Sequence, residues 1–135
     1  MAIGIDLVMV SRVQASLARF GERFLRRVFT DAEIAYATSV PELGAERLAA
    51  RFAAKEATIK ALGLADRGVG WREIEVAREQ SGKCRLILHG AARAAADGAG
   101  VSELSVSLSH EGDYSAAVVL AVRPEPQHVQ ETTQA

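Results

Sequence analysis

The chain has 135 residues, of which 49% are hydrophobic and 24% charged, and its formal net charge is −1. This balance is typical of a single globular domain, and so small a net charge gives no reason to expect general affinity for nucleic acid. No apolar run is long enough to span a bilayer and the start lacks a signal-peptide pattern, so we expect a cytoplasmic protein. A single cysteine, Cys84, excludes an internal disulfide and a cysteine zinc cluster.

The first half of the sequence predicts one strand followed by helices. Gly21 can interrupt the first helix, Thr30 and Glu33 match a capping box, Pro41 suits a first helical turn, and Gly63 is a natural stop. The predicted elements are a buried strand over 2–8, an amphipathic helix over 11–28, a short helix that starts after Thr30, and a long helix over 41–62.

The second half predicts strands, in most cases adjacent to one another along the chain. Ser81 and Gly82 mark a turn, and leucine or valine alternates with serine from 104 to 109, as in a half-buried strand. The predicted elements are a glycine-rich loop over 63–70, strands over 71–79 and 83–89, a helix over 90–98, and strands over 104–109 and 114–122. This order indicates an α+β domain over 1–123, with a largely antiparallel sheet packed on one long central helix and a disordered tail over 124–135.

The long helix combines an apolar stripe with a face of small residues. Its wheel aligns Leu48, Phe52, Ile59 and Leu62 as the expected core stripe, with Lys55 in the middle. A lysine at such a position must reach out to water or meet an anion, because an unpaired buried charge is costly. The small face consists of Ala49, Ala53 and Ala57, and another backbone could approach it closely.

Charged residues on the same helix can be read in two ways. Glu56 and Lys60 can form an ordinary ion pair one turn apart, worth about 0.2–0.5 kcal/mol, and Arg51 can be a solvated surface charge. Together with Lys55, however, the set offers three cations and a carboxylate that could bind a phosphate chain beside a metal ion. Asp6, at the end of the first strand, supplies a second carboxylate, and two such oxygen ligands suit magnesium.

Five motifs together resemble the holo-acyl-carrier-protein synthase type of 4'-phosphopantetheinyl transferase. They are GIDLV at 4–8, FTDAE at 29–33, RFAAKEATIKALG at 51–63, GK at 82–83 and SLSHEGDYSAAVV at 107–119. The motifs follow the order and spacing of that family through Val122. The chain departs from it at Cys84, where the family usually has proline after the GK pair.

The resemblance implies an enzyme that moves phosphopantetheine from coenzyme A to a serine of an acidic apo acyl carrier protein, and it implies a homotrimer with active sites shared between subunits. Asp6 and Glu56 would bind Mg²⁺, with water at the position that larger relatives fill with a third acid, since residue 8 is Val8. Glu56 and Lys60 would be catalytic. The implied coenzyme A contacts are Arg51, Lys55, Lys60, Gly82, Lys83, Ser109 and His110.

In the implied reaction, the carrier serine attacks the β-phosphorus of coenzyme A and adenosine 3',5'-bisphosphate leaves. The proton acceptor stays open among a metal-bound water, Glu111 and a group on the carrier. Residues 1–30 hold five arginines against two acidic residues, which suggests one basic binding face. If the helix over 11–28 is continuous, these arginines share one side, and the expected carrier contacts are Arg12, Arg19, Arg23 and Arg26.

Three other classes of protein share part of these features. A non-catalytic coenzyme A or nucleotide-binding module needs the basic residues but not both Asp6 and Glu56. An interaction protein with a basic helix predicts no dependence on metal. A metal-dependent nucleotide hydrolase needs the metal site but not the arginine-rich helix. The full set of motifs favours the transferase.

Overall fold

The computed structural model describes residues 1–124. Of the tail that the sequence predicts over 124–135, only Pro124 lies among the described residues, so the disorder expected there stays a prediction. Within the described part, no helix is long and apolar enough to cross a membrane. The cytoplasmic location also stays a prediction.

The first half folds into one strand, four α-helices and one 3-10 helix, in agreement with the predicted order. The predicted helix over 11–28 is divided, because Gly21 adopts a positive φ of 55° that ends one helix and starts the next. Thr30 forms the predicted capping box with Glu33. The elements are β1 (Ala2–Met9), α1 (Val10–Phe20), α2 (Glu22–Val28), α3 (Asp31–Thr38), the 3-10 helix η1 (Pro41–Leu43) and α4 (Gly44–Leu62).

The described part of the second half contains the four remaining strands, one α-helix and one 3-10 helix. Gly63 ends α4 in the left-handed conformation, as expected for a stop. The predicted strand over 71–79 is shorter, because its first three residues form a 3-10 turn. The elements are η2 (Trp71–Glu73), β2 (Ile74–Arg78), β3 (Cys84–Leu88), α5 (Gly90–Gly98), β4 (Glu103–Glu111) and β5 (Tyr114–Val122).

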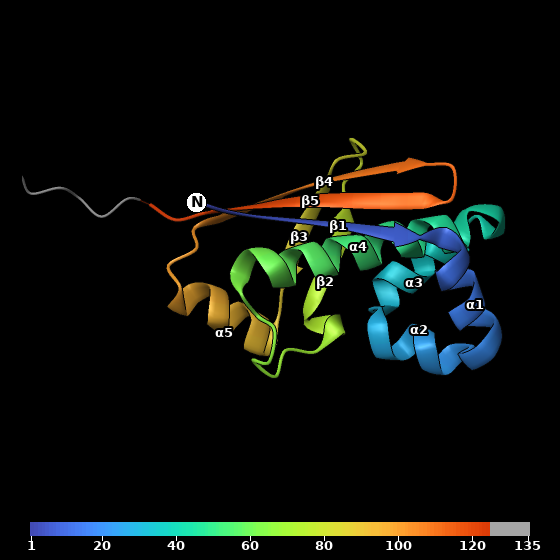
Figure 1. The fold of residues 1–135 in the computed structure, drawn as a ribbon, viewed down its shortest axis with the longest axis horizontal. Coiled ribbons are helices and arrows are strands. Elements are labelled where there is room, and N and C mark those ends of the chain that lie inside the picture. Colours follow the sequence, from blue (N-terminus) through green and yellow to red (C-terminus); the bar gives the residue numbers. More distant parts are fainter. Residues whose placement is uncertain (125–135) are drawn as a thin grey trace, which may run out of the picture.

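The strands pair antiparallel, as predicted, but they form two sheets rather than one. The larger sheet has the order β1-β5-β4, and β2 and β3 form a separate hairpin. Figure 1 views the larger sheet nearly edge-on above α4, with α1–α3 gathered near one end of α4 and α5 near the other. The α+β architecture with a central helix is therefore confirmed.

The alanine face of α4, rather than the predicted leucine stripe, lies deepest in the molecule. Ala53 and Ala57 are fully buried, whereas Phe52 and Ile59 are only partly buried. Strand β1 approaches this face so closely at Gly4 that a Cβ atom there would overlap the backbone carbonyl of Ala57. The small face predicted from the helical wheel is thus where a strand packs, and this contact fixes β1 against α4.

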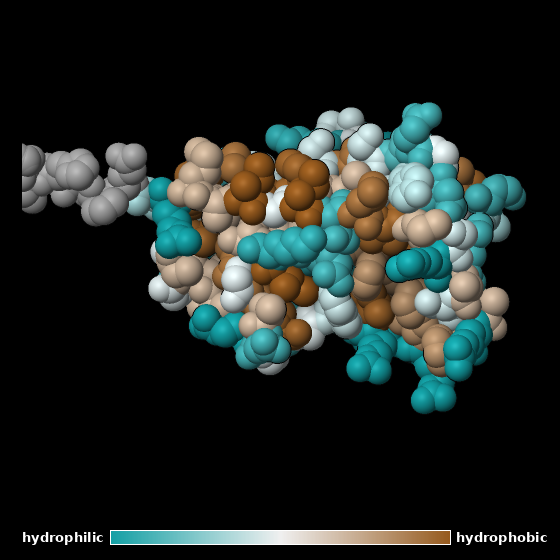
Figure 2. Space-filling view, viewed as in Figure 1, coloured by the Kyte–Doolittle hydropathy of each residue, from teal (hydrophilic) through white to brown (hydrophobic). Residues whose placement is uncertain are grey.

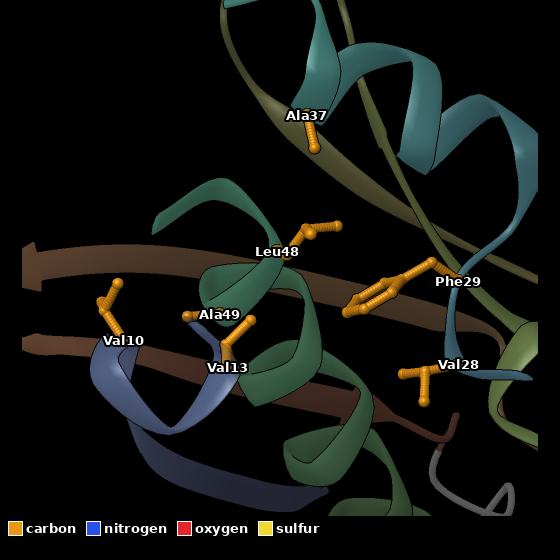
Figure 3. Packing of buried hydrophobic residues seen from close by; sticks show 7 residues of the cluster. All are labelled: Val10, Val13, Val28, Phe29, Ala37, Leu48 and Ala49. Atoms are coloured by element: carbon orange, nitrogen blue, oxygen red, sulfur yellow. The ribbon is translucent and has the colours of Figure 1, made fainter. Parts of the chain in front are cut away.

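A cluster of buried apolar side chains packs helices α1–α3 against α4. Figure 3 shows side chains from α1, from the α2–α3 segment and from α4 directed into one group. Phe29 lies fully buried in it, next to Phe24 in an edge-to-face arrangement with ring centroids 5.9 Å apart. This packing holds the arginine-bearing helices α1 and α2 near the first half of α4.

One face of the larger sheet carries exposed apolar side chains. Ile3, Ile5 and Leu7 of β1 are 68%, 63% and 62% exposed. Their register partners on β5 are Leu120, Val118 and Ala116. Figure 2 shows brown residues gathered over the part of the molecule where Figure 1 places β1 and β5. Strand β1 therefore exposes three large apolar side chains along one face of the sheet.

Candidate active site

Asp6 and Lys60 meet where β1 crosses α4. The Lys60 ammonium donates to Asp6 Oδ1 and to the Ile5 carbonyl oxygen, each at 3.0 Å. The Asp6 side chain is 18% exposed and that of Lys60 is 54% exposed. The carboxylate is thus held near the surface beside a cation that can reach solvent. The alternative prediction of a Glu56–Lys60 ion pair is wrong, since among the described residues Lys60 bonds Asp6 instead.

Glu56 and Asp6 line one surface hollow of about 490 Å³, together with Arg12, Phe52 and Tyr114. Partial burial and then the negative charge of Asp6 raise the pKa of Glu56, although nearby Lys60 opposes the shift. Two carboxylates that repel each other at the edge of a hollow are stabilised by a divalent cation. Their hard oxygen atoms also match the ligands that Mg²⁺ prefers, so this donor set fits the predicted metal.

Lys55 does not lie in this site, which corrects its predicted role as a coenzyme A contact. Its side chain is fully buried, and its ammonium donates to Glu33 Oε1 at 2.8 Å and to the carbonyl oxygens of Trp71 and Ile74. Burial lowers the pKa of Lys55, and the Glu33 carboxylate opposes that shift. The lysine has met an anion inside the protein, the second of the two outcomes that its position in the core stripe predicted.

A second hollow, of about 650 Å³, gathers several predicted coenzyme A contacts on another side of α4. Arg51, Gly82, Ser109 and His110 all line it, and Lys83 is exposed in the adjoining hairpin turn. His110 is exposed, with Nδ1 3.5 Å from Glu46 Oε2. The fold therefore brings residues from these separate motifs together at one hollow.

Arg51 is not the solvated surface charge that one interpretation allowed. It is only 4% exposed, and burial lowers the pKa of its guanidinium. Its Nε atom is buried without a hydrogen-bond partner among the described residues. A buried donor without an acceptor is costly, so this arginine is suited to receive an anion from outside the chain.

Three further residues of the same hollow were missed by sequence reasoning. Tyr36, Arg47 and Arg78 line it beside Arg51. Arg47 lies one helical turn before Arg51 and could have been found from that spacing. Tyr36 and Arg78 carry no such local signal, because they come from α3 and β2 and meet only in the folded chain.

Comparison with known proteins identifies the family. The sequence profile of the 4'-phosphopantetheinyl transferase superfamily matches residues 2–119. A holo-[acyl-carrier-protein] synthase of Moorella thermoacetica is 51% identical over 117 residues, which cover 87% of this chain and 90% of that protein. The chain belongs to the holo-[acyl-carrier-protein] synthase family within this superfamily.

Other holo-[acyl-carrier-protein] synthases agree with this assignment. One from Koribacter versatilis is 47% identical over 118 residues, covering 87% of this chain and 94% of the relative. The crystal structure of the Helicobacter pylori enzyme in complex with coenzyme A has a TM-score of 0.78 at 27% identity, covering 89% of this chain and 99% of that one. The resemblance inferred from the motifs is confirmed, and the activity of the chain is phosphopantetheine transfer from coenzyme A to an apo acyl carrier protein.

Within this synthase, the two hollows open on different faces of α4. Arg51 and Glu56 are five residues apart, which turns their side chains about 140° around the helix axis. The described residues that line the carboxylate hollow and those that line the arginine hollow are two separate sets. One chain thus presents two separate candidate hollows rather than a single enclosed pocket.

The arginines of the synthase do not form one continuous stripe, because the helix is broken at Gly21. Arg12 lines the carboxylate hollow. Arg23 lines a neighbouring groove between α2 and α4, with Phe24 and Phe52 shared between groove and hollow. Arg19 lies over the Phe20 ring, and Arg26 bonds Glu22 at 2.8 Å. Arg12 and Arg23 are therefore the members of the predicted carrier surface that adjoin the metal-binding candidates.

Proposed function

We propose that Asp6 and Glu56 hold the magnesium ion with which this synthase performs its transfer, and that Lys60 contacts the transferred phosphoryl group. One observation carries the proposal: both carboxylates line a single hollow, where partial burial and then the negative charge of Asp6 raise the pKa of Glu56. Arg12 lines the same hollow, and Lys60 lies beside it through its ion pair with Asp6. The ion would supply Lewis-acid polarisation and a template for the diphosphate oxygens.

Lys60 and Arg12 are two cations next to the proposed magnesium ligands. The carrier serine attacks the β-phosphorus of coenzyme A, and adenosine 3',5'-bisphosphate leaves. Such phosphoryl transfer mainly requires positioning and the neutralisation of charge. Lys60, with half of its side chain exposed, can turn its ammonium from Asp6 towards a phosphate oxygen. Arg12 offers a second cation at the rim of the same hollow.

Intact-protein mass spectrometry of an apo carrier protein tests the metal assignment. With coenzyme A and Mg²⁺ we expect a mass gain of one phosphopantetheine, and a chelator should abolish it. Glu56→Gln should lower the rate at least about 100-fold while the protein stays folded. The exposed Glu42→Gln is the matched control and should react as the parent does. Near-normal turnover by Glu56→Gln would remove Glu56 from the metal site.

The arginine hollow is the proposed site for the nucleotide end of coenzyme A. Arg51 and His110 are suited to phosphate oxygens, because one is buried with a free donor and the other lies exposed at the rim. Gly82, Lys83 and Ser109 adjoin them from two hairpin segments. Arg51→Ala should therefore raise the KM for coenzyme A more than it lowers kcat, and steady-state kinetics would measure this.

The carrier surface is proposed at α1 and α2, around Arg12, Arg19, Arg23 and Arg26. Attraction between these cations and an acidic carrier would be screened by salt. We expect that raising the salt concentration weakens binding of the carrier more than binding of coenzyme A. Titration calorimetry at two ionic strengths measures both affinities, and a salt-independent carrier affinity would count against this surface.

We propose that the protein is a homotrimer in which neighbouring subunits complete each active site. Two features support this: the exposed apolar face formed by Ile3, Ile5 and Leu7, and the opening of the two hollows on different sides of α4. At a coenzyme A concentration well below the KM of Arg51→Ala, the Glu56→Gln and Arg51→Ala proteins should each have low activity alone. They should regain activity when their subunits are refolded together. If the site lies within one subunit, mixing will restore nothing, and light scattering will report the number of subunits independently.

A further inference from the structure

Tyr36 brings three arginines together at the arginine hollow. Its ring centroid lies 4.2 Å from the guanidinium carbon of Arg47, 4.3 Å from that of Arg51 and 5.7 Å from that of Arg78. In addition, Arg78 Nη1 donates a hydrogen bond to the Tyr36 hydroxyl. Guanidinium groups bind aromatic rings through cation–π contact, so one side chain of α3 gathers cations from α4 and β2.

The gathered arginines are not neutralised by the protein around them. Among the described residues that line the hollow, the carboxylate is Glu46, which lies next to His110. Arg47 donates instead to the carbonyl oxygen of Tyr36, at 2.9 Å. Three like charges held this closely repel one another unless an anion is present. The hollow therefore has a surplus of donors and of positive charge.

Arg51 is the side chain that most directly indicates an external anion. It is only 4% exposed, and its Nε atom lacks a partner among the described residues. Its Nη1 makes only a long hydrogen bond, 3.4 Å to the Arg47 carbonyl oxygen. Guanidinium groups bind phosphate oxygens through paired N–H donors, so a phosphate would satisfy what the protein leaves free.

The backbone at Gly82 leaves room for the third arginine. Gly82 has a φ of 89° in the turn between β2 and β3, and a Cβ atom there would lie 3.3 Å from Arg78 Nη2. A side chain at this position would therefore displace the Arg78 guanidinium as well as strain the turn. The glycine of the GK motif therefore leaves space for an arginine of the same cluster that Tyr36 contacts.

We propose that Tyr36 is a positioning residue, which holds Arg47, Arg51 and Arg78 in the orientation that a phosphomonoester group of the ligand requires. The proposal rests on the proposed function, in which the diphosphate of coenzyme A lies at Asp6 and Glu56. The phosphate that remains for a separate arginine cluster is then the monoester at the 3' position of the ribose. Coenzyme A would be preferred over dephospho-coenzyme A because only the former carries that group.

The test compares the affinities of two nucleotides by titration calorimetry. Adenosine 3',5'-bisphosphate carries the additional phosphate, and adenosine 5'-monophosphate lacks it. Arg78→Ala and Tyr36→Phe should each weaken binding of the bisphosphate about 10-fold, since a charge-assisted contact is lost or misplaced, and should change the monophosphate affinity less than twofold. Tyr36→Leu, which also removes the ring, should weaken the bisphosphate further, towards 100-fold.

Two controls separate a positioning role from a structural one. In the double variant Tyr36→Phe/Arg78→Ala, the bisphosphate should bind as in Arg78→Ala alone, because the hydroxyl acts through that guanidinium. Arg93→Ala removes an exposed arginine of α5, far from this hollow along the chain, and should leave both affinities unchanged. Equal weakening of binding for both nucleotides, or no change for either, would overturn the proposal. If Tyr36→Leu unfolds, the affinities of Tyr36→Phe still decide between these outcomes.

The same samples distinguish failure of this inference from failure of the proposed function. Phosphopantetheine transfer with Mg²⁺ is measured in parallel by mass spectrometry. If transfer depends on Glu56 but Tyr36→Phe retains the preference for the bisphosphate, the role of Tyr36 is refuted while the metal site stands. If Tyr36→Phe loses that preference but transfer does not need Glu56, the metal site is refuted while the role of Tyr36 stands.

Discussion

Replacing Lys55 by methionine should weaken the fold strongly and leave coenzyme A binding unchanged. Methionine has a similar length and volume, so the substitution removes the charge without opening a large cavity. What is lost is the contact of the ammonium with Glu33 and with two backbone carbonyl oxygens. Glu33 is itself 1% exposed and would remain as a buried carboxylate without its cation.

The expected cost follows from that buried partner. Removing one member of a buried ion pair typically costs about 3–5 kcal/mol. Glu33 also accepts hydrogen bonds from the backbone amides of Thr30 and Val76, which soften but do not replace the lost charge. For a domain of this size, the loss corresponds to a fall in Tm of roughly 10–20 °C.

Urea unfolding followed by circular dichroism measures this loss, and calorimetry below the transition measures the affinity for coenzyme A. Lys83→Met, at an exposed position, is the control for stability and should shift the transition little. We expect the affinity of Lys55→Met for coenzyme A to stay within about twofold of the parent. An unchanged transition together with affinity at least about 10-fold weaker would refute the reasoning and return Lys55 to the ligand site.

Three further predictions concern the carboxylate hollow and its supports. Gly4→Ala places a Cβ against a backbone carbonyl of α4, so we expect a loss of about 2–3 kcal/mol in thermal unfolding and weaker Mn²⁺ binding by electron paramagnetic resonance; unaltered values would mean that β1 can shift. Asp113→Ala removes two hydrogen bonds to Ser11 at the start of α1, and should cost about 1 kcal/mol and raise the KM for the carrier; an unchanged Tm would contradict this. Because the pKa of Glu56 is raised above its ordinary 4.5, the folded state holds more protons there, and the metal-free protein should lose stability as pH rises through that window. Glu56→Gln should abolish that loss in a Tm–pH series.

Local patterns predicted the elements well because each depends on residues near one another in the sequence. The capping box at Thr30, the stop at Gly63 and the hairpin turn at Gly82 all formed as expected. The division at Gly21 was anticipated only as an option, because a glycine permits a positive φ without requiring one. The separation of the strands into two sheets depends on long-range packing and had no local signal.

The site was predicted less completely, for two physical reasons. Lys55 and Arg51 both have the charge that a ligand site needs. Charge alone does not reveal whether a buried cation is paired with a carboxylate inside the protein or left to bind a ligand. The structure gives Lys55 an internal carboxylate and leaves Arg51 with a free donor. Tyr36 and Arg78 were missed because an aromatic ring acts on a guanidinium only through contacts that the fold creates.

The separate faces of α4 explain how one helix can carry so much of the site without losing its place in the fold. Its alanine face lies against β1 and admits no large side chain, since Gly4 already touches the helix backbone. Lys55 ties a second face to Glu33 of α3, while Glu56 and Arg51 are left at the two hollows. Because a helix fixes the angle between residues at set spacings, the carboxylate and arginine parts keep their relative orientation as long as the helix is intact. The packing of the alanine face against β1 therefore fixes the position of the helix that carries both sets of side chains. Substitutions in this face should disturb both hollows together.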